Sequence, residues 1–335
     1  MATLHGIHFS RDGKQAGHIA VPHSSHRSAY GQIVLPLVRI GNGPGPVALL
    51  SAGVHGDEFE GQVALRNLAR TLEPADIRGA LLILPMANAP AVTASSRISP
   101  IDDLNLNRVF PGDNLGTPTQ AIAAAIEEHL LSVCDFAFDI HSGGSSLLYD
   151  VLGFTTATGE PGPDAQRMAL LKALGLHAGM LLSSESAMGL SASLDGAMLR
   201  QGVIGVSAEF GGAGVISSQT LRQCEDSLLK FLVHIGILRR PATKEGLGHP
   251  FRLYSDEAPG AYAFAEHSGL MELVVTIGES VAVGDLIGQI HNLHDPLSAP
   301  KQVHAAVSGR ILCLRAMPRI EIGDCIAQIG QEQRP

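Results

Sequence analysis

From residue 46 onward, short apolar runs alternate with longer segments whose apolar residues recur at helical spacing. Runs of this length predict buried strands, and the segments between them predict amphipathic helices. The expected strands span 46–52, 80–86, 134–140, 150–156 and 203–209, and the expected helices span 60–72, 119–133, 164–174 and 219–235. We therefore expect an α/β fold with a mixed, mostly parallel sheet flanked by helices.

The two ends of the chain depart from this alternation. Residues 1–45 predict a lead-in of short strands, because their apolar segments are bounded by Gly, Pro and Ser. Residues from about 250 to 330 predict short strands with Gly turns, and they follow a polar segment at 239–246. We therefore expect a main α/β domain at 1–242 and a small all-β barrel-sandwich domain at 243–335.

Composition and charge narrow the classes of function. With 335 residues, the chain exceeds the size at which one core usually keeps growing, and its 45% hydrophobic residues are enough to fill a large core. A formal net charge of −9 argues against a nucleic-acid partner, because phosphate binding needs a basic face. The absence of Trp argues against an aromatic platform for sugars or nucleobases.

The sequence also predicts a cytoplasmic protein without a membrane partner. No uninterrupted stretch of about 18 apolar residues is present, and residues 1–10 lack the apolar core of a secretory signal. The four cysteines are widely spaced inside apolar segments and form no Cys-x-x-Cys pair. We expect buried thiols in a reducing compartment.

Three ionisable residues lie where predicted strands end. His55 and His141 each follow closely after a strand, and Glu209 ends another. In sheets of this kind, ligands bind at the carboxyl ends of the strands. We therefore expect the chemistry of the protein at this edge of the sheet.

His55 and Glu58 are three residues apart at the start of a helix-like segment, so both can reach one metal ion if the turn is already helical. Zinc accepts such a nitrogen and oxygen pair, and a catalytic zinc usually takes a third protein ligand and leaves a position for water. Alone the pair is a weak signal, since a His and a Glu near a helix start also serve as a cap and a solvated side chain.

A long segment at 87–118 has little predicted regular structure, which in a compact domain indicates a functional or disordered loop. It contains Arg97 and the run at 105–112, in which apolar and polar residues alternate, so we expect it to be ordered. The guanidinium of Arg108 matches a carboxylate bidentately, and Asn107 beside it adds a directional donor. The alternative for Arg108 is a surface ion pair.

Four motifs in this order resemble the succinylglutamate desuccinylase/aspartoacylase family, whose members are zinc-dependent N-acyl amino acid hydrolases related to the metallocarboxypeptidases. The motifs are Gly-Val-His-Gly-Asp-Glu at 53–58, Asn-Leu-Asn-Arg-Val-Phe-Pro-Gly at 105–112, Asp-Ile-His-Ser-Gly-Gly at 139–144 and Ala-Glu-Phe-Gly-Gly at 208–212. Within the family, the likeness is greatest to the N-acetyl-diaminobutyrate deacetylases of ectoine degradation, judged by Ser-Pro-Ile-Asp at 99–102 and the tail domain. The resemblance implies a zinc carboxypeptidase-like fold for the main domain.

Carried over by position, the resemblance also implies a metal centre. His55, Glu58 and His141 would bind one zinc ion per chain, and Glu209 would be the general base. Asp139, two residues before His141, is expected either to orient a ligand imidazole or to make a structural hydrogen bond at the strand end.

The same resemblance implies the contacts to the substrate. Asn107 and Arg108 would hold the substrate carboxylate, and Arg97 would polarise the scissile carbonyl. Two further carboxylates lie beside the first ligand pair. From their positions, we expect Asp57 to be a cap or a partner of the ligands and Glu60 to be a helix N-terminal charge.

The C-terminal region resembles the small β-sandwich of biotinyl and lipoyl domains, through two Gly-Asp turns at 284–285 and 323–324. Those carriers present a modifiable Lys at a hairpin tip, and no Lys occurs between Gly269 and Pro300. A swinging-arm function is therefore not expected. We prefer a cap that walls the zinc cleft, and the alternative is a role in packing or oligomerisation only.

These observations predict a zinc-dependent amidohydrolase of amino-acid metabolism that acts on a linear amide and releases the acyl group of a small N-acyl amino acid. Two alternatives stay open: a metallocarboxypeptidase acting on peptides, and a zinc- or ligand-binding protein without catalysis. The presence of Glu209 argues against the second, since a binding protein needs no base. A homo-oligomer stays open as well. The loop at 183–195 is expected to cover the site.

Overall fold

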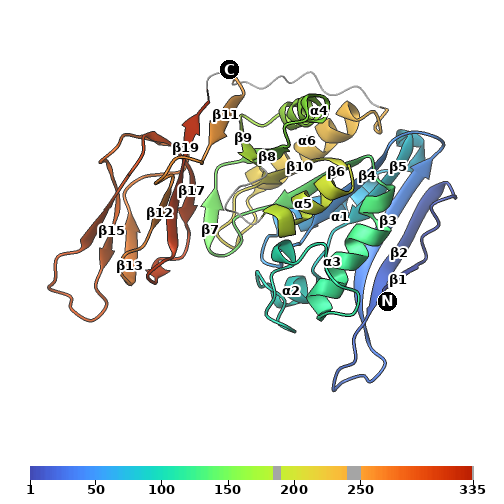
Figure 1. Cartoon of the computed structure of the whole chain (residues 1–335), viewed down its shortest axis with the longest axis horizontal. Helices are drawn as coiled ribbons and strands as arrows, with labels where there is room; N and C mark the ends of the chain where they lie inside the picture. Colours follow the sequence, from blue (N-terminus) through green and yellow to red (C-terminus); the bar gives the residue numbers. More distant parts are fainter. Residues whose placement is uncertain (184–189, 240–249, 334–335) are drawn as a thin grey trace.

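The computed structural model describes residues 1–183, 190–239 and 250–333. The larger part of the molecule is a sheet between two layers of helices, and the C-terminal part is all β (Figure 1). The expected fold class is thus confirmed. No helix within the described ranges is long and apolar enough to cross a membrane.

The sheet of the larger part is mixed and has a parallel centre. Its strands, in hydrogen-bonded order, are β1 (Thr3–His5), β2 (Gly13–Pro22), β3 (Gln32–Asn42), β5 (Gly79–Leu84), β4 (Val47–Ala52), β6 (Phe136–His141), β10 (Ile204–Glu209), β8 (Leu152–Ala157) and β9 (Ala178–Ser183). The run from β5 to β10 is parallel, whereas β8 is antiparallel to β10.

Helices cover both faces of this sheet (Figure 1). One face carries α1 (Glu60–Thr71), α4 (Pro161–Ala173) and α6 (Ser218–His234), and the other carries α3 (Pro118–His129) and α5 (Leu194–Arg200). Along β4, Leu49 packs into the cluster with α3 and α5, and Leu50 packs into the cluster with α1, α4 and α6. Because both faces are buried, the central strands read as continuous apolar runs in the sequence.

The segment expected to lack regular structure contains a short helix, α2 (Ala89–Ala94), as well as a 3₁₀ turn. The side chain of Asn88 caps this helix by accepting a hydrogen bond from the N–H of Ala91 at 3.4 Å. The sequence pattern does not predict α2, because a helix of 6 residues is too short to show a helical repeat. The 3₁₀ turns of the described chain are Pro74–Asp76, Leu106–Arg108, Leu131–Val133 and Leu190–Ala192.

The loop expected at 183–195 lies partly outside the described residues. Its described end forms a 3₁₀ turn and the first turn of α5, which the sequence pattern also does not predict. The side chain of Ser193 caps α5 by accepting a hydrogen bond from the N–H of Gly196 at 3.1 Å. This end of the expected loop is therefore held by a capped helix.

The C-terminal part has its own buried core, which includes Ile287, Ile311 and Ile329. Its strands are β11 (Arg252–Ser255), β12 (Tyr262–Phe264), β13 (Gly269–Leu273), β14 (Ser280–Val281), β15 (Leu286–His291), β16 (Lys301–His304), β17 (Gly309–Arg315), β18 (Arg319–Ile320) and β19 (Cys325–Glu332). The boundary expected between residues 242 and 243 lies outside the described residues. We propose that the region after it is a second domain.

Two strand pairings join this region to the larger part. β11 is parallel to β9 and antiparallel to β19, so the main sheet continues into the C-terminal region. A short strand that follows the His141 segment, β7 (Leu147–Tyr149), pairs with β17. The region that the sequence pattern sets apart thus shares hydrogen-bonded strands with the α/β part.

An ionic contact reinforces this junction. Asp150, directly after β7, accepts hydrogen bonds from Nη2 and Nε of Arg310 on β17 at 2.9 and 3.1 Å. The Nε2 atom of His177 lies 3.2 Å from the same carboxylate. Burial alone would raise the pKa of Asp150, but His177 and Arg310 outweigh it, so the pKa lies below the ordinary value.

Replacing Asp150 with Asn is expected to lower the free energy of unfolding by about 1–3 kcal/mol near pH 7, because Arg310 then keeps a partly buried charge without its counter-charge. The folded-state pKa lies below the unfolded value of about 3.9, so the contribution is complete above that value and is lost as the pH falls through the folded-state pKa. The stability difference should stay constant from about pH 7 to 5 and shrink below about pH 4. Because the chain lacks Trp, urea unfolding is followed by circular dichroism.

The matched control is Glu332→Gln. Glu332 pairs with Arg252 at 3.2 Å, and both side chains are about half exposed. For this exposed pair, the free energy of unfolding is expected to fall by less than about 0.5 kcal/mol. An equally small loss for Asp150→Asn would show that the junction does not depend on its ion pair.

Candidate metal centre and active site

The parallel register of the central strands brings the predicted site residues to one edge of the sheet. Glu209 at the end of β10 is the register partner of His141 at the end of β6. His55 lies in the turn between β4 and α1. This turn packs against α2 so closely that a Cβ atom on Gly56 would lie 2.0 Å from the backbone of Ala91. Only Gly permits this approach, because it has no Cβ atom. The close contact holds α2 and the loop after it next to the site.

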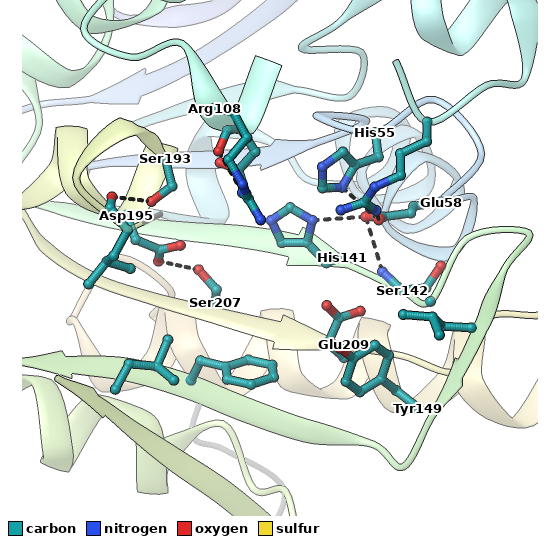
Figure 2. Close-up of a pocket in the computed structure, with 17 residues that line it drawn as sticks. His55, Glu58, Arg108, His141, Ser142, Tyr149, Ser193, Asp195, Ser207 and Glu209 are labelled. Carbon is teal, nitrogen blue, oxygen red and sulfur yellow. Dashed lines mark hydrogen bonds and ion pairs between the residues drawn. The ribbon is translucent and has the colours of Figure 1, made fainter. Parts of the chain in front are cut away.

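His55, Glu58 and His141 form a buried cluster at this edge (Figure 2). The Nδ1 atom of His55 lies 2.7 Å from Oε1 of Glu58, and Nδ1 of His141 lies 2.8 Å from Oε2. Ligand atoms of the three side chains all lie within 4.8 Å of one another. Two imidazole nitrogens and a carboxylate oxygen at this spacing can hold a metal ion.

The far nitrogens of both imidazoles are also held. Nε2 of His141 lies 2.7 Å from Oδ2 of Asp139, whose other oxygen accepts a hydrogen bond from Ser51 Oγ at 2.6 Å. Nε2 of His55 lies 3.2 Å from Oδ1 of Asn105. Acceptors in these positions orient the rings and leave each Nδ1 facing the cluster. Of the two expectations for Asp139, the contact with the imidazole is the one that the structure shows.

Burial and nearby charges govern the ionisation of the cluster. Burial lowers the pKa of His55 below its ordinary value. Burial acts in the same direction on His141, but the charges of Asp139 and Glu58 outweigh it and raise the pKa well above the ordinary value. Burial opposes ionisation of Glu58, but the two imidazoles outweigh it and lower the pKa far below the usual range. The cluster therefore favours an ionised carboxylate at Glu58 and a protonated imidazole at His141, whereas the imidazole of His55 favours its neutral form.

Glu209 is enclosed beside the cluster. Burial, and then the charge of Glu58, raise its pKa to about 8. Its Oε2 atom is buried and has no hydrogen-bond partner in the described chain. Figure 2 shows its carboxyl group pointing into the cavity, towards Glu58 and Ser142. A carboxyl group with such a pKa can both accept and release a proton near neutral pH.

All the predicted site residues line one cavity of about 110 Å³. These residues are His55, Glu58, Arg97, Asn107, Arg108, His141 and Glu209. Their gathering from five separate segments supports the site that the sequence predicts. The cavity suits a small molecule, because its volume is small and polar groups converge on it.

The three residues expected to contact the substrate differ in their present partners. Nη1 of Arg97 lies 3.4 Å from Oε1 of Glu58. Arg108 is exposed to solvent, donates from Nη1 to the backbone oxygen of Asn107 at 2.7 Å, and forms no ion pair with the described residues. The side-chain oxygen of Asn107 accepts a hydrogen bond from the N–H of Leu194 at 2.8 Å. Asn107 therefore also fixes the start of α5.

The cavity is also lined by residues that the sequence reasoning does not identify, among them Tyr149, Asp195 and Ser207. Ser207 lies two residues before Glu209 on β10, and side chains two apart on a strand point to the same face. The alternation of side chains along the strand could therefore have identified Ser207 from the sequence. Asp195 lies in the first turn of a helix of 7 residues, which leaves little pattern to read. Tyr149 lies in a strand of 3 residues and has no comparable signal.

Other expectations are modified by the structure. Asp57 accepts hydrogen bonds from the N–H and the hydroxyl of Ser145, each at 2.8 Å, and so holds the loop after β6. Glu60 is the first residue of α1, as expected, but it is buried. None of the described residues of the C-terminal region lines the cavity, which corrects the expectation that this region walls it directly. Its contribution is indirect, through Leu147 and Tyr149 of β7, which pairs with β17.

Comparison with known sequences identifies close relatives. The model of the succinylglutamate desuccinylase/aspartoacylase catalytic domain matches residues 44–235. The chain is also 35% identical to an N-alpha-acetyl-L-2,4-diaminobutyric acid deacetylase of Halomonas elongata, over 97% of this chain and 94% of that protein.

Solved structures agree with this assignment. A succinylglutamate desuccinylase from Silicibacter sp. TM1040 matches with a TM-score of 0.92 and 33% identity, covering 99% of this chain and 98% of that chain. The product-bound ectoine utilization protein EutE (DoeB) from Ruegeria pomeroyi matches with a TM-score of 0.92 and 35% identity, covering 98% of both chains. The resemblance based on four motifs is confirmed, and the chain belongs to the succinylglutamate desuccinylase/aspartoacylase family.

Proposed function

We propose that this protein is a zinc-dependent deacylase that hydrolyses the amide bond of Nα-acetyl-L-2,4-diaminobutyrate, a small N-acyl amino acid. The observation that carries the proposal is the buried cluster of His55, Glu58 and His141 with Glu209 beside it. Family membership supports the reaction, and the 35% identity to a deacetylase of this compound supports the substrate.

Zinc fits the donor set of the cluster. His55 and His141 each present Nδ1, their far nitrogens are held by Asn105 and Asp139, and Glu58 supplies the oxygen. Three protein ligands are typical of a catalytic zinc. When bound, zinc would lower the pKa of a water molecule and polarise the amide oxygen.

Glu209 acts as the general base. It holds the attacking water and takes its proton as the water oxygen bonds to the acyl carbon. It then gives this proton to the amide nitrogen as the carbon–nitrogen bond breaks, so that water and the amide yield acetate and an amine. Burial raises the pKa of Glu209 to about 8, which suits a group that accepts and releases a proton in each cycle.

The cavity arginines bind and polarise the substrate. Arg108 forms no ion pair in the described chain, so its guanidinium is free to bind the substrate carboxylate. The side-chain oxygen of Asn107 accepts a hydrogen bond from the N–H of Leu194. The side-chain NH₂ group of Asn107 therefore remains to donate a hydrogen bond to the same substrate carboxylate. Arg97 stabilises the oxyanion that develops on the acyl oxygen, a contribution often of about 3–4 kcal/mol.

A cytoplasmic location is part of the proposal. Cys134, Cys224, Cys313 and Cys325 are all free thiols. Burial raises the pKa of Cys224 and Cys313 well above the ordinary value. Free, unreactive thiols of this kind are typical of a reducing compartment.

The zinc-loaded protein is expected to release amine from Nα-acetyl-L-2,4-diaminobutyrate and to act poorly on its Nγ-acetyl isomer and on N-succinyl and N-formyl amino acids. Initial rates of amine release across this panel provide the measurement, with dipeptides as the contrast. Turnover of dipeptides alone would make the protein a peptidase. Bound zinc without turnover of any compound would favour a binding protein.

Replacing Glu209 with Gln is expected to leave zinc bound and to lower kcat by about 10²- to 10⁴-fold, because the amide keeps the shape but cannot accept a proton. Zinc content is measured by atomic emission and kcat by acetate release. Circular dichroism confirms that the variant is folded. Activity close to that of the wild type would remove Glu209 from the mechanism.

Replacing His141 with Ala is expected to lower the zinc content from about one ion per chain to a small fraction after dialysis, because only two protein ligands remain. The matched control is His267→Ala, since His267 is exposed in the C-terminal region. The control should keep its zinc. Unchanged zinc in His141→Ala would exclude His141 from the ligand set.

A further inference from the structure

A carboxylate on α5 lies over the same face of the sheet as the general base. Ser207 and Glu209 are two residues apart on β10, so their side chains point to the same side. The hydroxyl of Ser207 donates a hydrogen bond to Oδ1 of Asp195. Figure 2 shows the Asp195 carboxylate on the Ser207 side of the cavity, away from Glu209.

Asp195 is held firmly in this place. It lies in the first turn of α5, which is capped by Ser193. Asn107 accepts a hydrogen bond from the N–H of Leu194, the residue directly before it. Ser193 in turn donates to the backbone oxygen of Leu190 at 2.7 Å. These contacts fix the backbone of Asp195, and Ser207 fixes one of its carboxylate oxygens.

Asp195 forms no ion pair with another residue of the described chain, although the charge of His141 acts on it from a distance. Neither Arg97 nor Arg108, which line the same cavity, forms an ion pair with it, and Oδ2 accepts no hydrogen bond from another described residue. Burial, and then the charge of Asp139, raise the pKa of Asp195. A cation placed beside this carboxylate would therefore be bound favourably.

Apolar side chains complete the surroundings. Phe154, Leu182 and Leu190 line the cavity and belong to one hydrophobic cluster. Phe154 on β8 is the register partner of Ser207, so it lies beside the residue that holds Asp195. Apolar walls with one carboxylate suit a short methylene chain that ends in an ammonium group.

We propose that Asp195 binds the side-chain ammonium group of the substrate and makes the cavity selective for N-acyl amino acids with a short cationic side chain. The proposal rests on the proposed function and adds the group that selects the side chain. Asp195 is thus a specificity residue, and Phe154, Leu182 and Leu190 contact the methylene groups. An anionic side chain is repelled at this position, and a neutral side chain leaves the carboxylate unpaired.

The lengths involved agree with this assignment. Residues two apart on a strand are separated by about 7 Å, which sets the spacing between Glu209 and Ser207. In 2,4-diaminobutyrate, four bonds of about 1.5 Å join the two nitrogens, so an extended side chain spans about 5 Å. A charge-assisted hydrogen bond adds about 2.8 Å. With the scissile nitrogen at Glu209, the side-chain ammonium group would therefore extend to about the register position of Ser207, whose hydroxyl holds Asp195.

The test compares two substrates of nearly equal shape, Nα-acetyl-L-2,4-diaminobutyrate and Nα-acetyl-L-2-aminopentanoate, which has a methyl group in place of the ammonium group. The wild type is expected to prefer the cationic substrate in kcat/KM. Asp195→Asn should lower kcat/KM for the cationic substrate by about 10- to 100-fold, because a charge-assisted contact is lost, and change the neutral one by less than about 3-fold. Zinc content should stay unchanged.

The matched control is Glu127→Gln. Glu127 on α3 pairs with Arg200 at the end of α5 at 2.9 Å, so this variant loosens the same helix without altering the cavity. The control should affect both substrates alike. Equal losses for both substrates in Asp195→Asn, as in the control, would show that Asp195 only positions α5 and would overturn the proposal.

A second measurement uses the wild type alone and does not depend on the folding of a variant. L-2,4-Diaminobutyrate is expected to inhibit at a concentration at least about 10-fold lower than L-2-aminopentanoate. Equal inhibition by the two amino acids, or equal turnover of the two acetylated substrates, would overturn the proposal that Asp195 binds the ammonium group. The proposed deacylase function would not be affected by either result. Absence of turnover of both substrates by the zinc-loaded protein would instead overturn the proposed function, and the subsite with it.

Discussion

The parallel register of β4, β6 and β10 is the constraint on which the rest of the site depends. Backbone hydrogen bonds fix neighbouring strands relative to one another, and side chains alternate along each strand. As a result, Asp139 and His141 of β6 share one face of the sheet with Ser207 and Glu209 of β10. The turn after β4 and the helix α5 then place their side chains next to these four residues.

The electrostatics of the cavity follow from the same arrangement. Glu58, Glu209 and Asp195 line one small cavity, and a fourth carboxyl group, that of Asp139, lies behind it against His141. Burial raises the pKa of two of them, Glu209 and Asp195, because negative charge there is poorly solvated. A bound metal ion and a cationic substrate would both relieve this cost by Coulombic attraction. The proposed cofactor and the proposed side-chain selectivity thus have one physical origin.

The C-terminal region contributes to the site through backbone pairing. β7 leaves the His141 segment and is held in place by β17, and Asp150 after it binds Arg310. Tyr149 of β7 lines the cavity, although the described residues of the C-terminal region do not. The region therefore acts as a support for one wall of the cavity.

The sequence by itself determined most of the sheet and most helices, because buried strands and amphipathic helices leave local patterns, and it predicted seven residues that line the cavity. It also determined the family, through four motifs at the strand ends and in one loop. Only the tertiary structure decided the parts that lack such patterns: the short helices α2 and α5, the support from β7, and the positions of Asn105 and Asp195. These residues are distant in sequence from their partners, and hydrogen bonds that form only in the folded chain bring them to the cavity.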